Sequence, residues 1–237
     1  MGIDLLCWER LVARAKPGLT VALFGYPELL VTEAKLIEAF GAALPDVDEQ
    51  STKQAAWHGW KGKLYNTDQA LKKLGYAPTY FDYYRFRHCE VVVDLNKTIA
   101  LPEAYDVVCD FGTTEHVFNV AQAWENLYDT CKEGGLVIQS NPMNRPNHGF
   151  WSFSPTAYQD FWLANGGSIE KFLVYDMVDK GQGPTTYDAM DLSEEHKTQR
   201  LKHGSELNVY CEVRLVKKEL PVKWPIQTKY RKLVEAK

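Results

Sequence analysis

Three aspartates each follow a short apolar run, and a carboxylate in that place can accept hydrogen bonds from hydroxyl or amino groups. Asp82, Asp94 and Asp110 end the runs TYF, VVV and VVC. Short apolar runs bounded by turn residues are typical of strands in a parallel sheet. Because ligands bind where the carboxyl ends of such strands meet, the sequence predicts that the three carboxylates share one ligand-binding edge.

Two histidines supply a second kind of chemistry, because imidazole titrates near neutral pH and can accept a proton. His148, in a segment rich in proline and asparagine, is the stronger candidate general base, and His116 is the weaker one. Each can instead be an ordinary surface residue, and Glu115 can simply favour the positive end of a helix. No tight ligand spacing joins these histidines to the aspartates, so we expect no metal site.

The elements that position these side chains alternate along the chain. We expect strands over 19–24, 78–81, 90–93, 106–109, 136–138, 169–175 and 207–215, and helices over 28–40, 67–74, 117–131 and 156–164. Such alternation is typical of an α/β fold with a parallel sheet covered on both faces. At 237 residues the chain is expected to form a single domain.

Three segments do not follow this alternation. Residues 42–66 show no clean period and are interpreted as an insertion or a lid. The polar stretch 179–206 is expected to be a mobile excursion over the site. Residues 217–237 form a basic tail, which we expect to be irregular.

Composition excludes several classes of protein. With 27 basic and 31 acidic side chains the net charge is −4, which disfavours non-specific nucleic-acid binding. The five cysteines form no C-x-x-C pair, so neither a zinc ribbon nor a disulfide framework is expected. We find no apolar run long enough to span a membrane and no secretory signal, and we expect a cytoplasmic protein. The oligomeric state is not predicted.

The stretch from Tyr105 to Asn144 resembles the class I methyltransferases that use S-adenosylmethionine (SAM). After the strand that ends at Asp110, the motif EHV follows at 115–117, KEGG at 132–135, and a proline at 142. Several spaced elements therefore agree in order. The resemblance covers residues 70–165 well and the first 66 poorly, and it is strongest to a bacterial or phage branch with poorly defined acceptors.

The resemblance implies a Rossmann-like, seven-stranded, mostly parallel sheet with helices on both faces and an antiparallel last strand. It also implies that SAM is the cofactor of an active methyltransferase, which acts on a small-molecule or saccharide-type acceptor. Methyl transfer is an in-line displacement, so alignment of the reactants supplies much of the catalysis. A nicotinamide-dependent oxidoreductase is disfavoured because G-x-G-x-x-G is absent after the first strand.

By the same resemblance, Asp82 and its neighbour Tyr83 lie where the family's acid binds the ribose. The remaining implied cofactor contacts are the adenine loop Asp94, Leu95 and Asn96, the methionine loop Asp110, Phe111, Gly112 and Thr113, and His116 at the pocket mouth. Asp82 and Asp94 can instead be ordinary turn residues, and Phe111 can be part of the core. Asn141, Asn144 and Trp151 are expected, with His148, to face the acceptor.

The loop after the first strand departs from the family pattern, which is acidic and rich in glycine. Here only Gly25 matches, and Tyr26 and Pro27 stand where a second glycine is usual. Gly25 and Tyr26 remain the expected contacts to the methionine end. The alternatives are that Glu28 or the patch at 57–60 binds that end, or that the chain is a catalytically inactive methyltransferase-like binding or scaffold protein.

Overall fold

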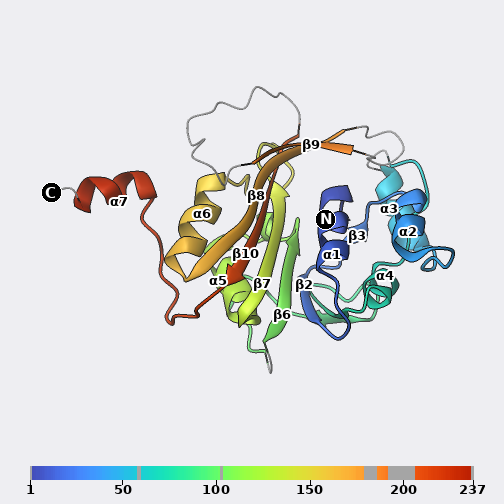
Figure 1. The fold of residues 1–237 in the computed structure, drawn as a ribbon, viewed down its shortest axis with the longest axis horizontal. Coiled ribbons are helices and arrows are strands. Elements are labelled where there is room, and N and C mark those ends of the chain that lie inside the picture. The colour runs from blue at the N-terminus through green and yellow to red at the C-terminus, as the bar shows by residue number, and fades with distance from the viewer. Residues whose placement is uncertain (1, 58–59, 102–103, 179–185, 192–205, 236–237) are drawn as a thin grey trace.

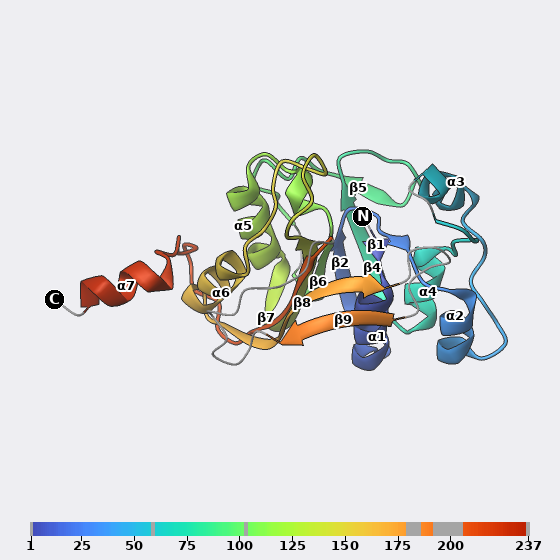
Figure 2. The ribbon, with the colours of Figure 1, turned by 90° about the horizontal axis from the view of Figure 1, so that it is seen from above.

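The computed structural model describes residues 2–57, 60–101, 104–178, 186–191 and 206–235. Within these residues the main sheet has eight strands, in the order β5-β4-β2-β6-β7-β10-β8-β9. Figure 1 shows the strands from β2 to β9 in this order, and Figure 2 labels β4 and β5. Their bounds are β2 (Thr20–Phe24), β4 (Ala77–Asp82), β5 (Glu90–Val92), β6 (Tyr105–Phe111), β7 (Cys131–Pro142), β8 (Gly167–Val178), β9 (Thr186–Asp191) and β10 (Asn208–Leu215).

The pairing of these strands confirms the predicted fold class. Strands β5, β4, β2, β6 and β7 are parallel to one another, and β10 is antiparallel to both β7 and β8. These seven strands form the Rossmann-like sheet, with the last strand of the chain reversed. Strand β9 adds an antiparallel edge next to β8. It lies within the predicted excursion 179–206, most of which is outside the described residues.

Helices cover both faces of this sheet. They are α1 (Leu5–Arg14), α2 (Glu33–Phe40), α3 (Glu49–Trp57), α4 (Thr67–Lys73), α5 (Val120–Thr130), α6 (Pro155–Ala164) and α7 (Thr228–Glu235), with a 3-10 turn η1 (Thr114–His116). Figure 2 shows α5 and α6 on one side of the central strands and α1, α2 and α4 on the other. Among the residues that the structure describes, no helix is both long and apolar enough to cross a bilayer.

Alternation along the strands explains the two layers of core. On β2, Val21 and Leu23 pack in the core beneath α1, α2 and α4, whereas Ala22 and Phe24 pack in the core beneath α5 and α6. Successive side chains of a strand point to opposite faces, so a strand buried on both sides has a continuous apolar sequence. The apolar runs predicted as strands are of this kind.

The structure differs from the expected elements at several places. The predicted helix 28–40 begins only at Glu33, because Glu28–Leu29 forms strand β3, which pairs with β1 (Gly2–Ile3). The segment 42–66 contains helix α3, and the tail contains helix α7, which projects from the body in Figure 1. Helix α1 was not predicted at all. At 28–29, pairing with the distant strand β1 overrides the local helix pattern.

Asp106, the second residue of β6, links this strand to the beginnings of β2 and β7. Its carboxylate accepts hydrogen bonds from the backbone N–H (2.9 Å) and hydroxyl (2.7 Å) of Thr20, and it lies 2.8 Å from Nζ of Lys132. The bond from Lys132 is the largest cause that holds the pKa of Asp106 down to about 2, against desolvation by burial. Such a group stabilises the fold above its unfolded pKa of about 4, and this contribution is lost as the pH falls towards 2.

We therefore expect Asp106→Asn to lower the free energy of unfolding by about 0.5–1 kcal/mol at pH 6. The difference from the wild type should shrink between pH 4 and pH 2, because the wild-type carboxylate becomes protonated there. Urea unfolding of both proteins across this range measures it. A difference that stays constant with pH would contradict the assignment.

Candidate active site

The carboxyl ends of the central strands lie together, as the sequence predicts. Phe24, the last residue of β2, is opposite Phe81 on β4 and opposite Asp110 on β6. Asp82 is the next residue of β4, and Asp94 follows the end of β5, which is paired with β4. The three aspartates therefore belong to one edge of the sheet, although their surroundings differ.

Asp82 is half-buried and is fixed by backbone donors. Its Oδ2 accepts a hydrogen bond from the N–H of Tyr26 (3.1 Å), and its Oδ1 accepts one from the N–H of Tyr83 (2.7 Å). A third and longer contact, of 3.5 Å, joins Oδ1 to the N–H of Tyr84. A carboxylate has about four lone-pair positions, so Asp82 keeps one for a ligand hydroxyl group and gains a second when the long contact to Tyr84 is exchanged. Its position and remaining capacity fit the ribose of a nucleoside.

The loop after β2 fits a methionine carboxylate poorly. Gly25 has a φ of 76°, the left-handed conformation that glycine adopts without strain, and this turns the chain away from β2. Its N–H donates to the carbonyl oxygen of Phe81 (2.7 Å), and the N–H of Tyr26 donates to Asp82. These two amides are thus already paired within the protein, so a hydrogen bond from either to the methionine end would require these bonds to be exchanged.

Asp94 forms a turn with the residues after it. Its Oδ1 accepts from the backbone N–H (3.1 Å) and side-chain amide (2.9 Å) of Asn96, and its Oδ2 lies 3.0 Å from Nζ of Lys97. The hydrogen bonds from Asn96, and then Lys97, lower the pKa of Asp94. Leu95 packs into the core below α5 and α6. At this loop Asp94 and the backbone remain the groups suited to contact an adenine.

Asp110 has no exposed surface and belongs to a buried polar network. It accepts hydrogen bonds from the N–H of Thr113 (3.0 Å) and from the side-chain amide of Asn141 (2.9 Å). The same amide of Asn141 donates to Glu115 Oε2 (3.1 Å), and its oxygen accepts from the hydroxyl of Tyr158 (2.7 Å). Asp110 and Asn141, predicted as ligand contacts, therefore lie beneath the edge of the sheet. There Asp110 positions the backbone of Thr113, and Asn141 positions the carboxylate of Glu115.

Burial and close approach shift the pKa values in this network. Desolvation, and then repulsion by Glu115, raise the pKa of Asp110 to about 6. Burial also acts to raise the pKa of Glu115, but hydrogen bonds from His148 and Asn141 and the charge of His116 outweigh it and lower that pKa. Burial lowers the pKa of His116. At neutral pH, Glu115 is therefore a carboxylate.

The loop between Asp110 and η1 lies against the end of β2. Gly112 has a φ of 84°, and the hydroxyl of Thr113 donates to the carbonyl oxygen of Phe24. Phe111, predicted to lie beside the cofactor, is only 2% exposed and packs in the core beneath α1. The loop backbone at Gly112 and Thr113, rather than the ring of Phe111, is the part that a ligand at this edge can reach.

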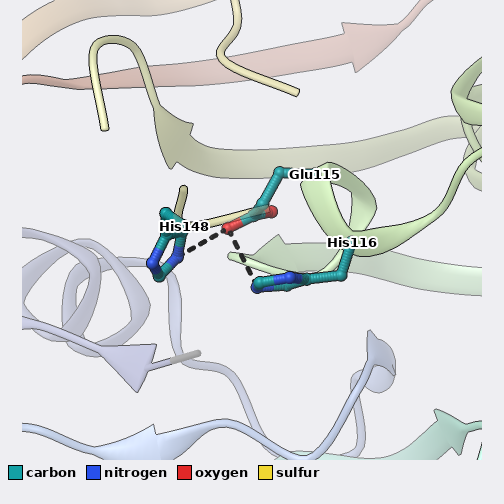
Figure 3. Close-up of side chains that lie close together, drawn as sticks. All are labelled: Glu115, His116 and His148. Atoms are coloured by element: carbon teal, nitrogen blue, oxygen red, sulfur yellow. Dashed lines mark ion pairs between the residues drawn. The ribbon is translucent and has the colours of Figure 1, made fainter. Parts of the chain in front are cut away.

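Glu115, His116 and His148 converge above this network (Figure 3). Nε2 of His148 lies 3.6 Å and Nε2 of His116 3.9 Å from Oε1 of Glu115. The Glu115 side chain is 1% exposed, whereas those of His116 and His148 are 42% and 35% exposed. The three side chains thus form an open cluster in which a metal ion or an acceptor group can be bound.

This cluster was not predicted, because the EHV motif and His148 are far apart in the chain. The loop after β7 returns to η1, where the N–H groups of Phe150 (2.8 Å) and Trp151 (3.2 Å) both donate to the carbonyl oxygen of Glu115. No spacing in the sequence indicates such a return. The only signal is that both histidines were already candidate proton acceptors.

The remaining predicted acceptor residues lie around this loop. The side-chain oxygen of Asn144 accepts from the N–H of Leu207 (2.7 Å), which ties the loop to the segment before β10. Trp151 donates through Nε1 to the carbonyl oxygen of Val117 (3.0 Å) and is exposed on its other side. It also lines a cavity of about 440 Å³ between α5, α6 and residues 224–227. Trp151 is therefore accessible to a bound molecule.

Comparisons with known proteins find no matching family model and no significantly similar curated protein. A TehB-like SAM-dependent methyltransferase from Corynebacterium glutamicum is 15% identical, with 89% of this chain and 86% of that chain covered, at a TM-score of 0.44. TehB from Haemophilus influenzae is 12% identical, with 62% of this chain and 52% of that chain covered, at a TM-score of 0.42. The O-methyltransferase from a trans-AT PKS multienzyme of Brevibacillus brevis, in complex with S-adenosyl-L-homocysteine, is also 12% identical. Here 70% of this chain and 53% of that chain are covered, at a TM-score of 0.39.

This chain spans about half the length of the latter two structures. Identities of 12–15% with TM-scores below 0.5 assign neither a family nor an activity to it.

Proposed function

We propose that this chain is a SAM-dependent methyltransferase that acts on a small-molecule or saccharide-type acceptor. The observation that carries the proposal is the half-buried carboxylate of Asp82 at the shared carboxyl edge, held by the N–H groups of Tyr26 and Tyr83. Ligands of open α/β sheets bind at this edge, and a carboxylate there is suited to the two hydroxyls of a ribose. The stretch from Tyr105 to Asn144 resembles the class I methyltransferases, and this resemblance supports SAM as the source of the nucleoside.

The residues present fit the nucleoside half of the cofactor better than its methionine half. Asp82 would bind the ribose, Asp94 with the backbone of Leu95 and Asn96 the adenine, and the backbone at Gly112 and Thr113 the methionine portion. SAM supplies an electrophilic methyl group when bound. The chain's own contribution is to hold the acceptor in line with that group and to exclude water.

A hydroxyl acceptor must also lose a proton, and His148 is positioned to accept it. Its Nε2 lies 3.6 Å from the carboxylate of Glu115, which stabilises the imidazolium that forms. His116 is the second candidate, at 3.9 Å from the same oxygen. On the acceptor side, Trp151 and Asn144 belong to the same loop as His148. The net charge of −4 favours an acceptor other than nucleic acid. A cytoplasmic location stays a prediction from the sequence.

A catalytically inactive binding or scaffold protein is the second candidate, and one observation favours it. The N–H groups of Gly25 and Tyr26 are hydrogen-bonded to Phe81 and Asp82 within the protein. A chain that binds only the nucleoside would not align a sulfonium with an acceptor. The methyltransferase and the inactive binding protein therefore differ in one measurable property. Only in the methyltransferase should the methionine end of the cofactor add to the affinity of its nucleoside.

Calorimetric titration with S-adenosylhomocysteine and with adenosine separates them. For the methyltransferase we expect micromolar binding of S-adenosylhomocysteine and clearly weaker binding of adenosine. Asp82→Ala should weaken the binding of S-adenosylhomocysteine by about 10- to 100-fold, because hydrogen bonds to a charged group contribute about 1.5–3 kcal/mol. Asp106→Asn, at the opposite end of the central strands, is the matched control and should leave the affinity unchanged.

Equal affinities for adenosine and S-adenosylhomocysteine would support the binding protein instead. If SAM, S-adenosylhomocysteine and adenosine all gave neither heat nor a thermal shift, both proposed functions would be contradicted. If the Asp82 and Asp106 variants changed the affinity for S-adenosylhomocysteine equally, the ligand would not be bound at Asp82.

A further inference from the structure

The cluster of Glu115, His116 and His148 has the composition and spacing of a metal site. One nitrogen from each histidine and one carboxylate oxygen all lie within 4.8 Å of one another. Ligand atoms at about 2.0–2.2 Å from a tetrahedral ion are about 3.4 Å apart. The Glu115–His148 and Glu115–His116 distances of 3.6 and 3.9 Å exceed this by only a few tenths of an ångström. Small side-chain rotations would therefore bring all three ligands onto one ion.

The buried side of this cluster is rigid. Oε2 of Glu115 accepts from the amide of Asn141, which is held in turn by Asp110 and Tyr158, so that Oε1 is directed to both histidines. Partners of this kind orient metal ligands and are part of a functional metal site. The carboxylate would thus be the fixed ligand, and the exposed histidines would be the adjustable ones.

The backbone also holds His148 in place. The carbonyl oxygen of Glu115 accepts hydrogen bonds from the residues that follow Gly149. A Cβ on Gly149 would lie 2.7 Å from that carbonyl oxygen, a contact too short for any residue but glycine. The loop can therefore approach η1 closely only because position 149 carries no side chain. This approach keeps His148 beside Glu115.

From this geometry we propose that Glu115, His116 and His148 bind a divalent transition metal of the zinc type. Two imidazole nitrogens and one carboxylate oxygen are the ligand set of many open zinc sites, whereas magnesium and calcium prefer oxygen ligands alone. Three protein ligands leave a coordination position open, and the exposure of both histidines directs it to solvent. Water, or an oxygen of an acceptor, would occupy that position.

The proposal does not depend on methyl transfer, because the ligands are complete without a cofactor. It does change the role of the two histidines, since an imidazole that ligates a metal through one nitrogen carries its proton on the other and cannot accept a second. Metal binding and general-base catalysis are therefore alternative uses of the same side chains.

Direct titration of the metal-free protein, prepared by dialysis against a chelator, tests the site. We expect one equivalent of Zn²⁺ to bind, and Co²⁺ to give a visible spectrum without a thiolate-to-metal charge-transfer band. His148→Ala and His116→Ala should each weaken binding by more than about 100-fold, since even partners outside the first shell contribute 10- to 100-fold. Both side chains are partly exposed and neither belongs to the apolar core, so these variants should fold, which circular dichroism checks.

The control is the exposed pair His88 and Cys89, which can bind metal adventitiously. The variants His88→Asn and Cys89→Ser should leave both the affinity and the cobalt spectrum unchanged; asparagine suits the φ of 61° at position 88. Absence of saturable binding by the wild type would overturn the proposal. So would a thiolate band, or loss of binding in the control variants alone. Titration with S-adenosylhomocysteine is a separate measurement, so failure of either proposal is seen independently.

Discussion

Replacement of Glu212 by alanine is expected to lower the free energy of unfolding by about 3–5 kcal/mol, because the partly buried guanidinium groups of Arg10 and Arg14 lose their shared counter-charge. Glu212 lies on β10 with its side chain fully buried. Its carboxylate accepts from Arg10, from Arg14 (2.7 Å) and from the hydroxyl of Tyr210 (2.7 Å). Burial acts to raise the pKa of Glu212, but the bonds from Arg10, Tyr210 and Arg14 outweigh it and lower that pKa. The carboxylate therefore stays charged, and its hydrogen bonds from Arg10 and Arg14 connect helix α1 to strand β10.

Urea unfolding at neutral pH measures this cost, and Glu170 provides the matched control. Glu170 also pairs with Arg14 (2.7 Å) and with Arg214 (2.9 Å), but its side chain is partly exposed. Glu170→Ala should therefore cost less than about 1 kcal/mol. Similar losses for the two variants would show that burial of the Glu212 pair does not decide its contribution.

Asn141→Leu is expected to cost about 2–4 kcal/mol, because one amide bridges two buried carboxylates. Without it, Asp110 and Glu115 would lose a shared donor (2.9 and 3.1 Å), and the hydroxyl of Tyr158 would lose its acceptor (2.7 Å). Leucine is of similar size, so the loss reports unpaired polar groups and not a cavity. The same change should loosen Glu115 and weaken binding at the cluster above it.

Tyr158→Phe separates the parts of this network. It removes only the hydroxyl that donates to Asn141, so both carboxylates keep their bridge, and a loss of about 1 kcal/mol is expected. Thermal and urea unfolding of both variants provide the comparison. If Tyr158→Phe were as destabilising as Asn141→Leu, the bridge between the carboxylates would not be the cause.

Much of the fold could be predicted because local signals and the final packing agree. The β6 strand is apolar throughout its centre, since both of its faces are covered. The helix α6 starts as expected, with Ser154 before a proline at its first position. The helix α1 also has a local signal, because Asp4 caps it by accepting from the N–H of Cys7 (3.0 Å). Its apolar stripe completes that signal.

Asp82 illustrates what sequence reasoning could establish about the site. Its place at the end of an apolar strand is a local property, and the common direction of parallel strands brings it to the same edge as Asp94 and Asp110. Side-chain alternation and strand direction follow from the backbone, so they can be inferred without knowledge of distant contacts.

The burial of Asp110 and Asn141 and the convergence of Glu115, His116 and His148 could not be inferred in this way. Each depends on a return of the chain: Tyr158 of α6 covers Asn141, and the loop after β7 hydrogen-bonds to the carbonyl oxygen of Glu115. Whether a polar residue lies beneath an edge or on it depends on which distant segment packs against it. That packing is decided by the summed free energy of the whole core, and no short stretch of the chain contains this information.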